Sequence, residues 1–182
     1  MRCNLLIFIF EPLTIQSLKT MQIESLHFHN YHEASLLVIE DNPDHWTIMQ
    51  AALKVSLPEI EVAWAQNKTQ ALTYLITRSL LKKPFPKLIL LDLYLPDRET
   101  GWQLLQELKN PENHYDHVPV VALSNSKDCT DVKKTYAFGA ASYIVKPQRY
   151  QDWITYLKQM SSYWWDQTAL PYSEETDTSA FA

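Results

Sequence analysis

The sequence predicts a doubly wound α/β fold, in which five parallel strands alternate with five helices. Two observations predict it. Short apolar segments alternate with longer helical patterns five times along the chain, and several of these segments are continuously apolar. Continuous apolar strands are typical of a parallel sheet that helices cover on both faces. The composition, 46% hydrophobic and 20% charged residues, provides enough apolar material for one sizeable core.

The first strand and helix are expected between residues 36 and 56. The apolar run Leu36–Ile39 predicts the strand, and the sequence Asn42-Pro43-Asp44 predicts a helix start, with a capping side chain and proline in the first turn. Four apolar residues at helical spacing predict the buried face of this helix: Ile48, Ala51, Ala52 and Val55.

The next two strands and helices follow with the same alternation. The sequence predicts these elements in order: a strand at 60–65, a helix at 66–81, a strand at 87–92 and a helix opening at Trp102 and running to Leu108. A proline-rich loop, 82–86, separates the first pair from the second.

The last two pairs complete the pattern. The sequence predicts strands at 118–124 and 142–145, with helices at 131–138 and from Tyr150 to about Trp165. Gly139 is expected to end the first of these helices, because glycine adopts the left-handed conformation common at that position.

Aromatic residues are concentrated in the last helix. Four residues predict its buried stripe: Trp153, Leu157, Met160 and Trp164. Tyr156, Tyr163 and Trp165 fall partly outside that stripe. Exposed aromatic side chains suggest an interface, most simply a symmetric homodimer through the last helix, although packing against the chain's own tail is an alternative.

The domain is expected to span residues 34–166. Residues 1–33 form an N-terminal extension with little predicted structure, and residues 167–182 form a polar, acidic tail. Translation could start at Met1 or Met21. Three histidines in the extension, His27, His29 and His32, are expected to bind metal loosely at best.

Charge and cysteine content exclude several classes of function. The formal net charge is -5 and the basic residues do not cluster, which argues against nucleic acid as a direct partner. The two cysteines, Cys3 and Cys129, match no metal spacing and no disulfide framework, so a reducing cytoplasm is expected. The apolar run at residues 5–10 is far shorter than the roughly 20 residues that span a bilayer, so no membrane segment is predicted.

Polar side chains stand where the predicted strands end. They are Glu40 and Asp41 after the first strand, Asp92 at the end of the third, Ser124 at the end of the fourth and Lys146 after the fifth. The carboxyl ends of parallel strands meet at one edge of the sheet, where ligands of such folds bind. We therefore expect these five residues to form one site.

The chemistry of that set points to phosphoryl transfer. Neighbouring carboxylates repel one another, and Mg²⁺, which prefers oxygen ligands, relieves that repulsion. A magnesium ion beside a lysine neutralises charge on a phosphoryl group. Asp92, on the central strand, is the best candidate for a nucleophile that forms an aspartyl phosphate.

Four motifs resemble the receiver domain of two-component response regulators. They are Leu37-Val38-Ile39-Glu40-Asp41, Leu90-Leu91-Asp92-Leu93-Tyr94-Leu95-Pro96, Val120-Val121-Ala122-Leu123-Ser124 and Ala140-Ala141-Ser142-Tyr143-Ile144-Val145-Lys146-Pro147. The resemblance covers residues 35 to about 165 and implies the flavodoxin-like receiver fold. It implies a Mg²⁺-dependent phosphoacceptor that acts as a signalling switch rather than as a turnover enzyme.

The resemblance also assigns roles to individual residues. A histidine kinase would phosphorylate Asp92, while Glu40, Asp41, Asp92 and the backbone carbonyl of Tyr94 would hold Mg²⁺. Three further residues complete the assignment: Lys146 would contact the phosphoryl group, Ser124 would move toward it, and Tyr143 would turn inward with Ser124.

Two features refine this resemblance. Gly101 stands nine residues after Asp92, one more than is usual in the family, so the loop 97–100 is expected to be one residue longer. The segments 160–165 and 168–171 resemble the C-terminus of single-domain regulators that partner bacterial phytochromes. We therefore expect a phytochrome-type kinase, no DNA-binding output domain, and signalling through contact with a downstream protein that the sequence does not identify.

Other functions on the same fold fit less well. A pseudo-receiver that signals by contact alone would lack an acid or the lysine, and here none is missing. A flavodoxin would need a phosphate-binding loop after the first strand, where this chain has Glu40 and Asp41. A haloacid-dehalogenase-type phosphatase would usually carry a second aspartate at the position of Tyr94.

Overall fold

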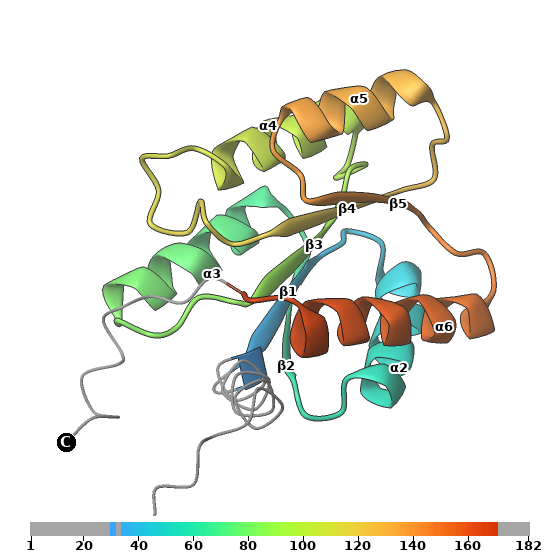
Figure 1. The fold of residues 1–182 in the computed structure, drawn as a ribbon. Helices are drawn as coiled ribbons and strands as arrows, with labels where there is room; N and C mark the ends of the chain where they lie inside the picture. Colours follow the sequence, from blue (N-terminus) through green and yellow to red (C-terminus); the bar gives the residue numbers. More distant parts are fainter. Residues whose placement is uncertain (1–29, 32–33, 171–182) are drawn as a thin grey trace, which may run out of the picture.

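A single five-stranded parallel sheet, in the order β2-β1-β3-β4-β5, forms the centre of the computed structural model, which describes residues 30–31 and 34–170 (Figure 1). The strands are β1 (Ser35–Ile39), β2 (Glu61–Ala65), β3 (Leu88–Asp92), β4 (Val120–Ser124) and β5 (Ser142–Val145). The helices that alternate with them are α2 (Pro43–Ser56), α3 (Lys68–Leu80), α4 (Arg98–Leu108), α5 (Cys129–Ala137) and α6 (Tyr150–Ser161). The predicted fold class is confirmed.

Two hydrophobic cores lie on opposite faces of the sheet. Successive side chains of β1 point to opposite faces, so Leu37 and Ile39 join the core beneath α3 and α4, while Leu36 and Val38 join the core beneath α2 and α6. All four are fully buried. Burial of such a side chain contributes about 1.5–3 kcal/mol relative to leaving it exposed, which explains why the strand has no polar alternation.

The buried face of α2 differs from the prediction. Ile48 and Val55 are 40% and 53% exposed, and Ala51 is exposed as well. The buried residues of this helix are Trp46, Met49, Ala52 and Leu53. The prediction was right for Ala52 and wrong for Ile48, Ala51 and Val55. Helical spacing fits both sets, so the error lies in which face of the helix turns inward.

Helix α4 begins four residues earlier than predicted. Asp97 caps it by accepting a hydrogen bond from the backbone N–H of Thr100 at 2.8 Å, so residues 98–100 form the first helical turn rather than a loop. Gly101 lies so close to the chain leaving β3 that a Cβ atom there would be 2.1 Å from the carbonyl oxygen of Leu93. A glycine is therefore required where the first turn of α4 contacts the backbone that directly follows β3.

The last helix widens at its C-terminal end. Residues Ser162–Gln167 form a π-helical segment, η1, which continues α6. A π-helix closes its hydrogen bonds over five residues rather than four. Trp165, five residues after the buried Met160, therefore lies on the same buried face of the helix. Trp165 is fully buried and Trp164 only partly, so the predicted assignment of these two tryptophans was wrong.

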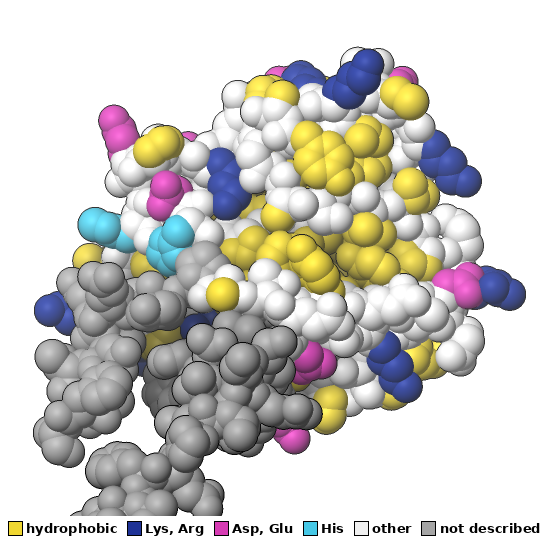
Figure 2. Space-filling view, viewed as in Figure 1, with side chains coloured by type: hydrophobic (Ala, Val, Ile, Leu, Met, Phe, Trp, Pro, Cys, Tyr) yellow, Lys and Arg dark blue, Asp and Glu magenta, His cyan; other side chains and the backbone are white. Residues whose placement is uncertain are grey.

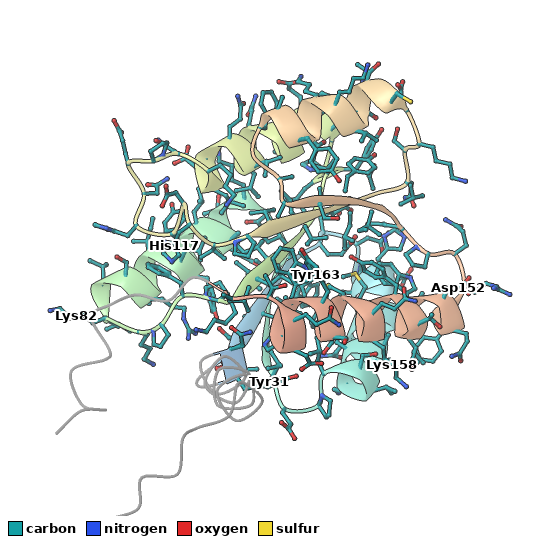
Figure 3. The ribbon with its side chains drawn as sticks, in the orientation of Figure 1. Tyr31, Lys82, His117, Asp152, Lys158 and Tyr163 are labelled. Carbon is teal, nitrogen blue, oxygen red and sulfur yellow. The ribbon has the colours of Figure 1, made fainter. Side chains whose placement is uncertain are left out.

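The described ends of the chain meet beside this segment. The buried side chain of Asn30 donates to the backbone carbonyls of Trp165 and Thr168, at 2.8 and 2.6 Å, and accepts from the N–H of Leu170. Tyr31 donates to Asp166, and Figure 3 shows it near the C-terminal end of the last helix. The sequence placed residues 30, 31 and 168–170 in flanking segments, whereas they lie against the domain.

The remaining N-terminal features lie outside the described residues. They include Met21 and the three histidines His27, His29 and His32. The division of the chain at residues 34 and 166 stays a prediction. Over residues 30–31 and 34–170, the structure contains no helix with the length and apolar character to cross a membrane.

Candidate functional site

The four innermost residues of the predicted site come from the ends of four strands. Asp92 is the last residue of β3, Ser124 is the last of β4, Glu40 directly follows β1, and Lys146 directly follows β5. All four side chains are buried. Since β1 and β3 are neighbours and the chain leaves them toward opposite sides of the sheet, the site lies at the topological switch point.

One ammonium group pairs with two carboxylates at this point. Nζ of Lys146 lies 2.6 Å from Oε2 of Glu40 and 2.7 Å from Oδ2 of Asp92. Burial raises the pKa of Glu40, the charge of Asp92 raises it further, and Lys146 opposes both effects. The three groups carry one excess negative charge when all are ionised, and burial of that charge is unfavourable unless a cation compensates it.

The donor groups at this point fit a divalent cation. Ligand atoms of Glu40, His45 and Asp92 all lie within 4.8 Å of one another. Carboxylate oxygens are the ligands that Mg²⁺ prefers, and a cation among them would relieve the excess charge. The structure thus brings together two of the predicted metal ligands, Glu40 and Asp92.

The other two predicted metal ligands lie at the margin of this group. Asp41 is half-buried and does not belong to the cluster of Glu40, His45 and Asp92. Tyr94 has an exposed side chain, and its backbone N–H donates to Oδ1 of Asp92 at 3.0 Å. This hydrogen bond orients the carboxylate of Asp92 and keeps the backbone of Tyr94 next to it.

Ser124 and Tyr143, the two predicted switch residues, contact the same loop residue. Asp92 is in register with Leu123, so Ser124 lies one position beyond Asp92 on the neighbouring strand. Its Oγ accepts a hydrogen bond from the N–H of Ser126, and the hydroxyl of Tyr143 donates to the carbonyl of Ser126. The loop after β4 therefore links the two residues.

His45 is a member of the site that the sequence reasoning missed. It lies in the first turn of α2, where Asn42 caps the helix through the backbone N–H groups of Asp44 and His45. Its Nδ1 is 3.1 Å from Oε1 of Glu40 and 3.2 Å from Nζ of Lys146. A histidine in the first turn of a helix that starts at the rim was the available signal.

A pair of stacked tryptophans borders the site. Nε1 of Trp64 donates to the backbone carbonyl of Glu40 at 2.8 Å, and its ring stacks on Trp46 with 4.9 Å between the ring centroids. Trp46 directly follows His45 in α2. Indole fluorescence from this pair is therefore expected to respond to changes at Glu40 and His45.

Comparison with known proteins agrees with this geometry. The family model described as "Response regulator receiver domain" matches residues 36–158, more than half of the chain. The response regulator Rcp1 of Synechocystis sp. is 30% identical over 138 residues, which cover 75% of this chain and 92% of that protein.

Solved structures give the same result. The phosphorylated cyanobacterial phytochrome response regulator RcpA superposes with a TM-score of 0.66 at 29% identity, over 76% of this chain and 99% of that one. The Mn²⁺-bound form of Rcp1 superposes with a TM-score of 0.63 at 28% identity, over 76% of this chain and 99% of that one. The predicted resemblance to phytochrome-associated regulators is thereby confirmed, and the chain belongs to the receiver-domain response regulators of two-component signalling.

Proposed function

We propose that Asp92 accepts a phosphoryl group from a histidine kinase in a Mg²⁺-dependent reaction, and that the phosphorylated chain signals by protein contact. One observation carries this proposal. The buried carboxylate of Asp92 lies at the end of the central strand β3, paired with Lys146 and beside the second buried acid, Glu40. A carboxylate held in this way is available as a nucleophile next to groups that bind a cation and a phosphate.

The reaction is a transfer between two residues. An oxygen of Asp92 attacks the phosphorus of the kinase phosphohistidine, the P–N bond breaks, and an aspartyl phosphate forms while the kinase imidazole leaves with a proton. Lys146 then neutralises a phosphoryl oxygen in place of the Asp92 carboxylate. Glu40, Asp92, Asp41 and the carbonyl of Tyr94 would hold Mg²⁺, which supplies further charge neutralisation. The phosphoryl group stays on the protein, so the reaction changes the signalling state of the chain and releases no small-molecule product from it.

The switch would use Ser124 and Tyr143. In this proposal the Ser124 hydroxyl turns from the N–H of Ser126 toward the phosphoryl oxygens, and Tyr143 moves inward as its hydrogen bond to the Ser126 carbonyl breaks. Both contacts involve one residue of a short loop, so a change at the first affects the second.

Intact-protein mass spectrometry tests the phosphorylation. The protein is incubated with acetyl phosphate or phosphoramidate, with Mg²⁺ and with EDTA. One phosphoryl group is expected with Mg²⁺ only, and none in D92N. The matched control is D97N, which removes an exposed acid five residues further along the chain and should still be phosphorylated. Equal labelling of the protein and D92N would refute the proposal.

The partner and the output surface are part of the same proposal. The similarity to a phytochrome response regulator supports a phytochrome-type histidine kinase as phosphodonor. Figure 2 displays hydrophobic side chains gathered on the face over β5 and the adjoining helices α5 and α6. The exposed large apolar side chains of these elements and of η1 are Tyr136, Val145, Tyr150 and Tyr163. We assign this face, with the last helix, to a homodimer.

Light scattering tests the dimer. The molar mass is measured with and without beryllofluoride, which mimics the phosphoryl group, for the protein and for a variant with Tyr150 and Tyr163 replaced by serine. We expect beryllofluoride to raise the dimer fraction of the protein and to leave the variant monomeric. A monomer under every condition would refute the dimer without affecting the phosphorylation.

A further inference from the structure

We propose that Nδ1 of His45 is a further protein ligand of the divalent cation, and that it shifts the preference of the site from Mg²⁺ toward Mn²⁺, Co²⁺ and Ni²⁺. The inference rests on the cation site of the proposed function and adds a nitrogen donor to it. The residues concerned are Glu40, Asp92 and His45, whose ligand atoms lie within 4.8 Å of one another. That spacing allows all three to contact one ion.

The ring nitrogen of His45 points into the cluster. Nδ1 lies 3.1 Å from Oε1 of Glu40 and 3.2 Å from Nζ of Lys146. A single ring nitrogen either donates or accepts, so it cannot donate to Glu40 and accept from Lys146 at the same time. When it accepts from Lys146, its lone pair is directed at a positive charge, which is the arrangement that a metal ion would use.

Lys146 marks the position of positive charge in the cluster. Its ammonium contacts Glu40, Asp92 and His45 together, at 2.6, 2.7 and 3.2 Å. A cation that binds the same three side chains would replace Lys146 at these atoms and free it for a phosphoryl oxygen. The imidazole supplies its lone pair without adding another negative charge to two buried carboxylates.

The exposure of the three ligands provides a path for the ion. The side chains of Glu40 and Asp92 are 1% and 6% exposed, whereas that of His45 is 39% exposed. The histidine therefore forms the outer wall of the cluster, where an ion from solvent arrives first. Its place in the first turn of α2, directly after the Asn42 cap, fixes the backbone that carries it.

The nature of the donor predicts the metal preference. Mg²⁺ prefers oxygen ligands and loses its water reluctantly, whereas imidazole binds first-row transition metals with affinity rising from Mn²⁺ through Co²⁺ to Ni²⁺. Replacing a water ligand by His45 thus gains little for Mg²⁺ and more for the transition metals.

Metal titration and pulsed EPR test the inference. All proteins carry alanine at His27, His29 and His32, so that the N-terminal histidines bind no metal. Tryptophan fluorescence from Trp46 and Trp64 follows the binding of Mg²⁺, Mn²⁺, Co²⁺ and Ni²⁺. The variants are H45A, H45D as an oxygen-donor replacement, and H114A as a matched control, which removes an exposed histidine from the loop before β4.

The expected results differ according to whether His45 binds the metal ion or only lies beside it. H45A should lower the affinity for Ni²⁺ and Co²⁺ by about tenfold or more, a loss typical of a disrupted metal site, and change Mg²⁺ affinity much less. H45D should bind Mg²⁺ at least as tightly as the parent protein, because it supplies an oxygen donor, but it should not restore the affinity for Ni²⁺ and Co²⁺. Mn²⁺ bound to the parent protein and to H114A should display ¹⁴N modulation from the imidazole, and Mn²⁺ bound to H45A or H45D should not.

Two outcomes would overturn the inference, and they are distinguishable from failure of the proposed function. Mn²⁺ binding without ¹⁴N modulation, or an unchanged ratio of Ni²⁺ to Mg²⁺ affinity in H45A, would leave the cation site intact and exclude His45 as a ligand. Absence of binding by every cation in the parent protein would instead refute the proposed site itself. Circular dichroism of each variant confirms that it is folded.

Discussion

The hydroxyl of Tyr143 on β5 donates a hydrogen bond to the backbone carbonyl of Ser126, 2.8 Å away in the loop after β4. The backbone N–H of Ser126 in turn donates to Oγ of Ser124, the last residue of β4. Ser126 is thus held from both sides, and the loop beside the candidate phosphorylation site depends on an edge-strand aromatic residue.

Replacing Tyr143 by phenylalanine should destabilise the protein slightly. The change removes one hydroxyl and leaves the ring, so the expected loss is about 0.5–1.5 kcal/mol of unfolding free energy, the usual net contribution of one hydrogen bond. Urea denaturation measures it. The exposed Tyr150→Phe is the control and should have no measurable effect; equal effects of the two variants would contradict the role of the Ser126 contact.

Replacing Lys146 by methionine should destabilise the protein strongly at neutral pH. Methionine keeps the volume but leaves Glu40 and Asp92 buried without a cation, and breaking such a pair typically costs about 3–5 kcal/mol. Urea denaturation of K146M and of the double variant K146M/D92N measures this. We expect D92N to recover part of the loss, because it removes one of the two carboxylates; no recovery would contradict the charge argument.

Replacing Gly101 by alanine should be far more damaging than the same change at Gly139. A Cβ at Gly101 would collide with the backbone of Leu93, which directly follows β3, and α4 would have to move, which we expect to cost more than about 3 kcal/mol. Gly139 has φ +90 and nearby only the flexible side chain of Lys109, so alanine there should cost about 1–2 kcal/mol. Thermal unfolding of both variants gives the comparison, and a smaller loss at Gly101 than at Gly139 would contradict it.

Replacing Trp165 by alanine should cost about 3–5 kcal/mol, the range for large aromatic residues in a core. Trp164 is only partly buried, so replacing it by alanine should lower the free energy of unfolding clearly less than replacing Trp165 does. Denaturant titration of W165A and W164A distinguishes the π-helical arrangement from a regular helix, in which the order of the two effects would be reversed.

His117 predicts a pH dependence of stability. It lies in the loop between α4 and β4 (Figure 3). The centroid of its ring is 5.9 Å from that of Phe85. Its side chain is 35% exposed, and the partial burial of the ring lowers its pKa below the ordinary value near 6.5, which the negative charge of Asp116 opposes only partly. Its contribution to stability is therefore complete above about pH 6.5 and is lost as the pH falls through the lowered pKa.

The variant H117Q isolates this effect. Unfolding free energies of the protein and of H117Q are compared between about pH 8 and pH 5. We expect the protein to lose more stability than H117Q on acidification through this range. Parallel curves for the two proteins would show that His117 does not contribute.

The sequence was sufficient for the order of elements and for the residues at the strand ends. Continuous apolar strands and helical spacing depend on local side-chain periodicity, and the carboxyl ends of parallel strands must share an edge. The sequence alone therefore places Glu40, Asp92, Ser124 and Lys146 together, and their roles in phosphorylation remain predictions.

The sequence-based predictions failed where they had to choose which face of a helix is buried and which residues meet through tertiary contacts. Ile48 and Met49 both fit a helical stripe, and only packing against the sheet selects Met49. Trp164 would be buried in a regular helix, and only the π-helical turn selects Trp165. His45 entered the site because the Asn42 cap fixes the first turn of α2 beside Glu40, a three-dimensional relationship that residue spacing alone does not reveal.

The contacts of Asn30 have a consequence for folding and for local opening. Its partners Trp165, Thr168 and Leu170 lie 135 to 140 residues further along the chain. Such contacts close very long loops, so they form only after almost the whole domain has been made and they favour late assembly. Once formed, they tie down the two segments that would otherwise fray first, and the amide of Leu170 should exchange its hydrogen as slowly as an amide within the domain.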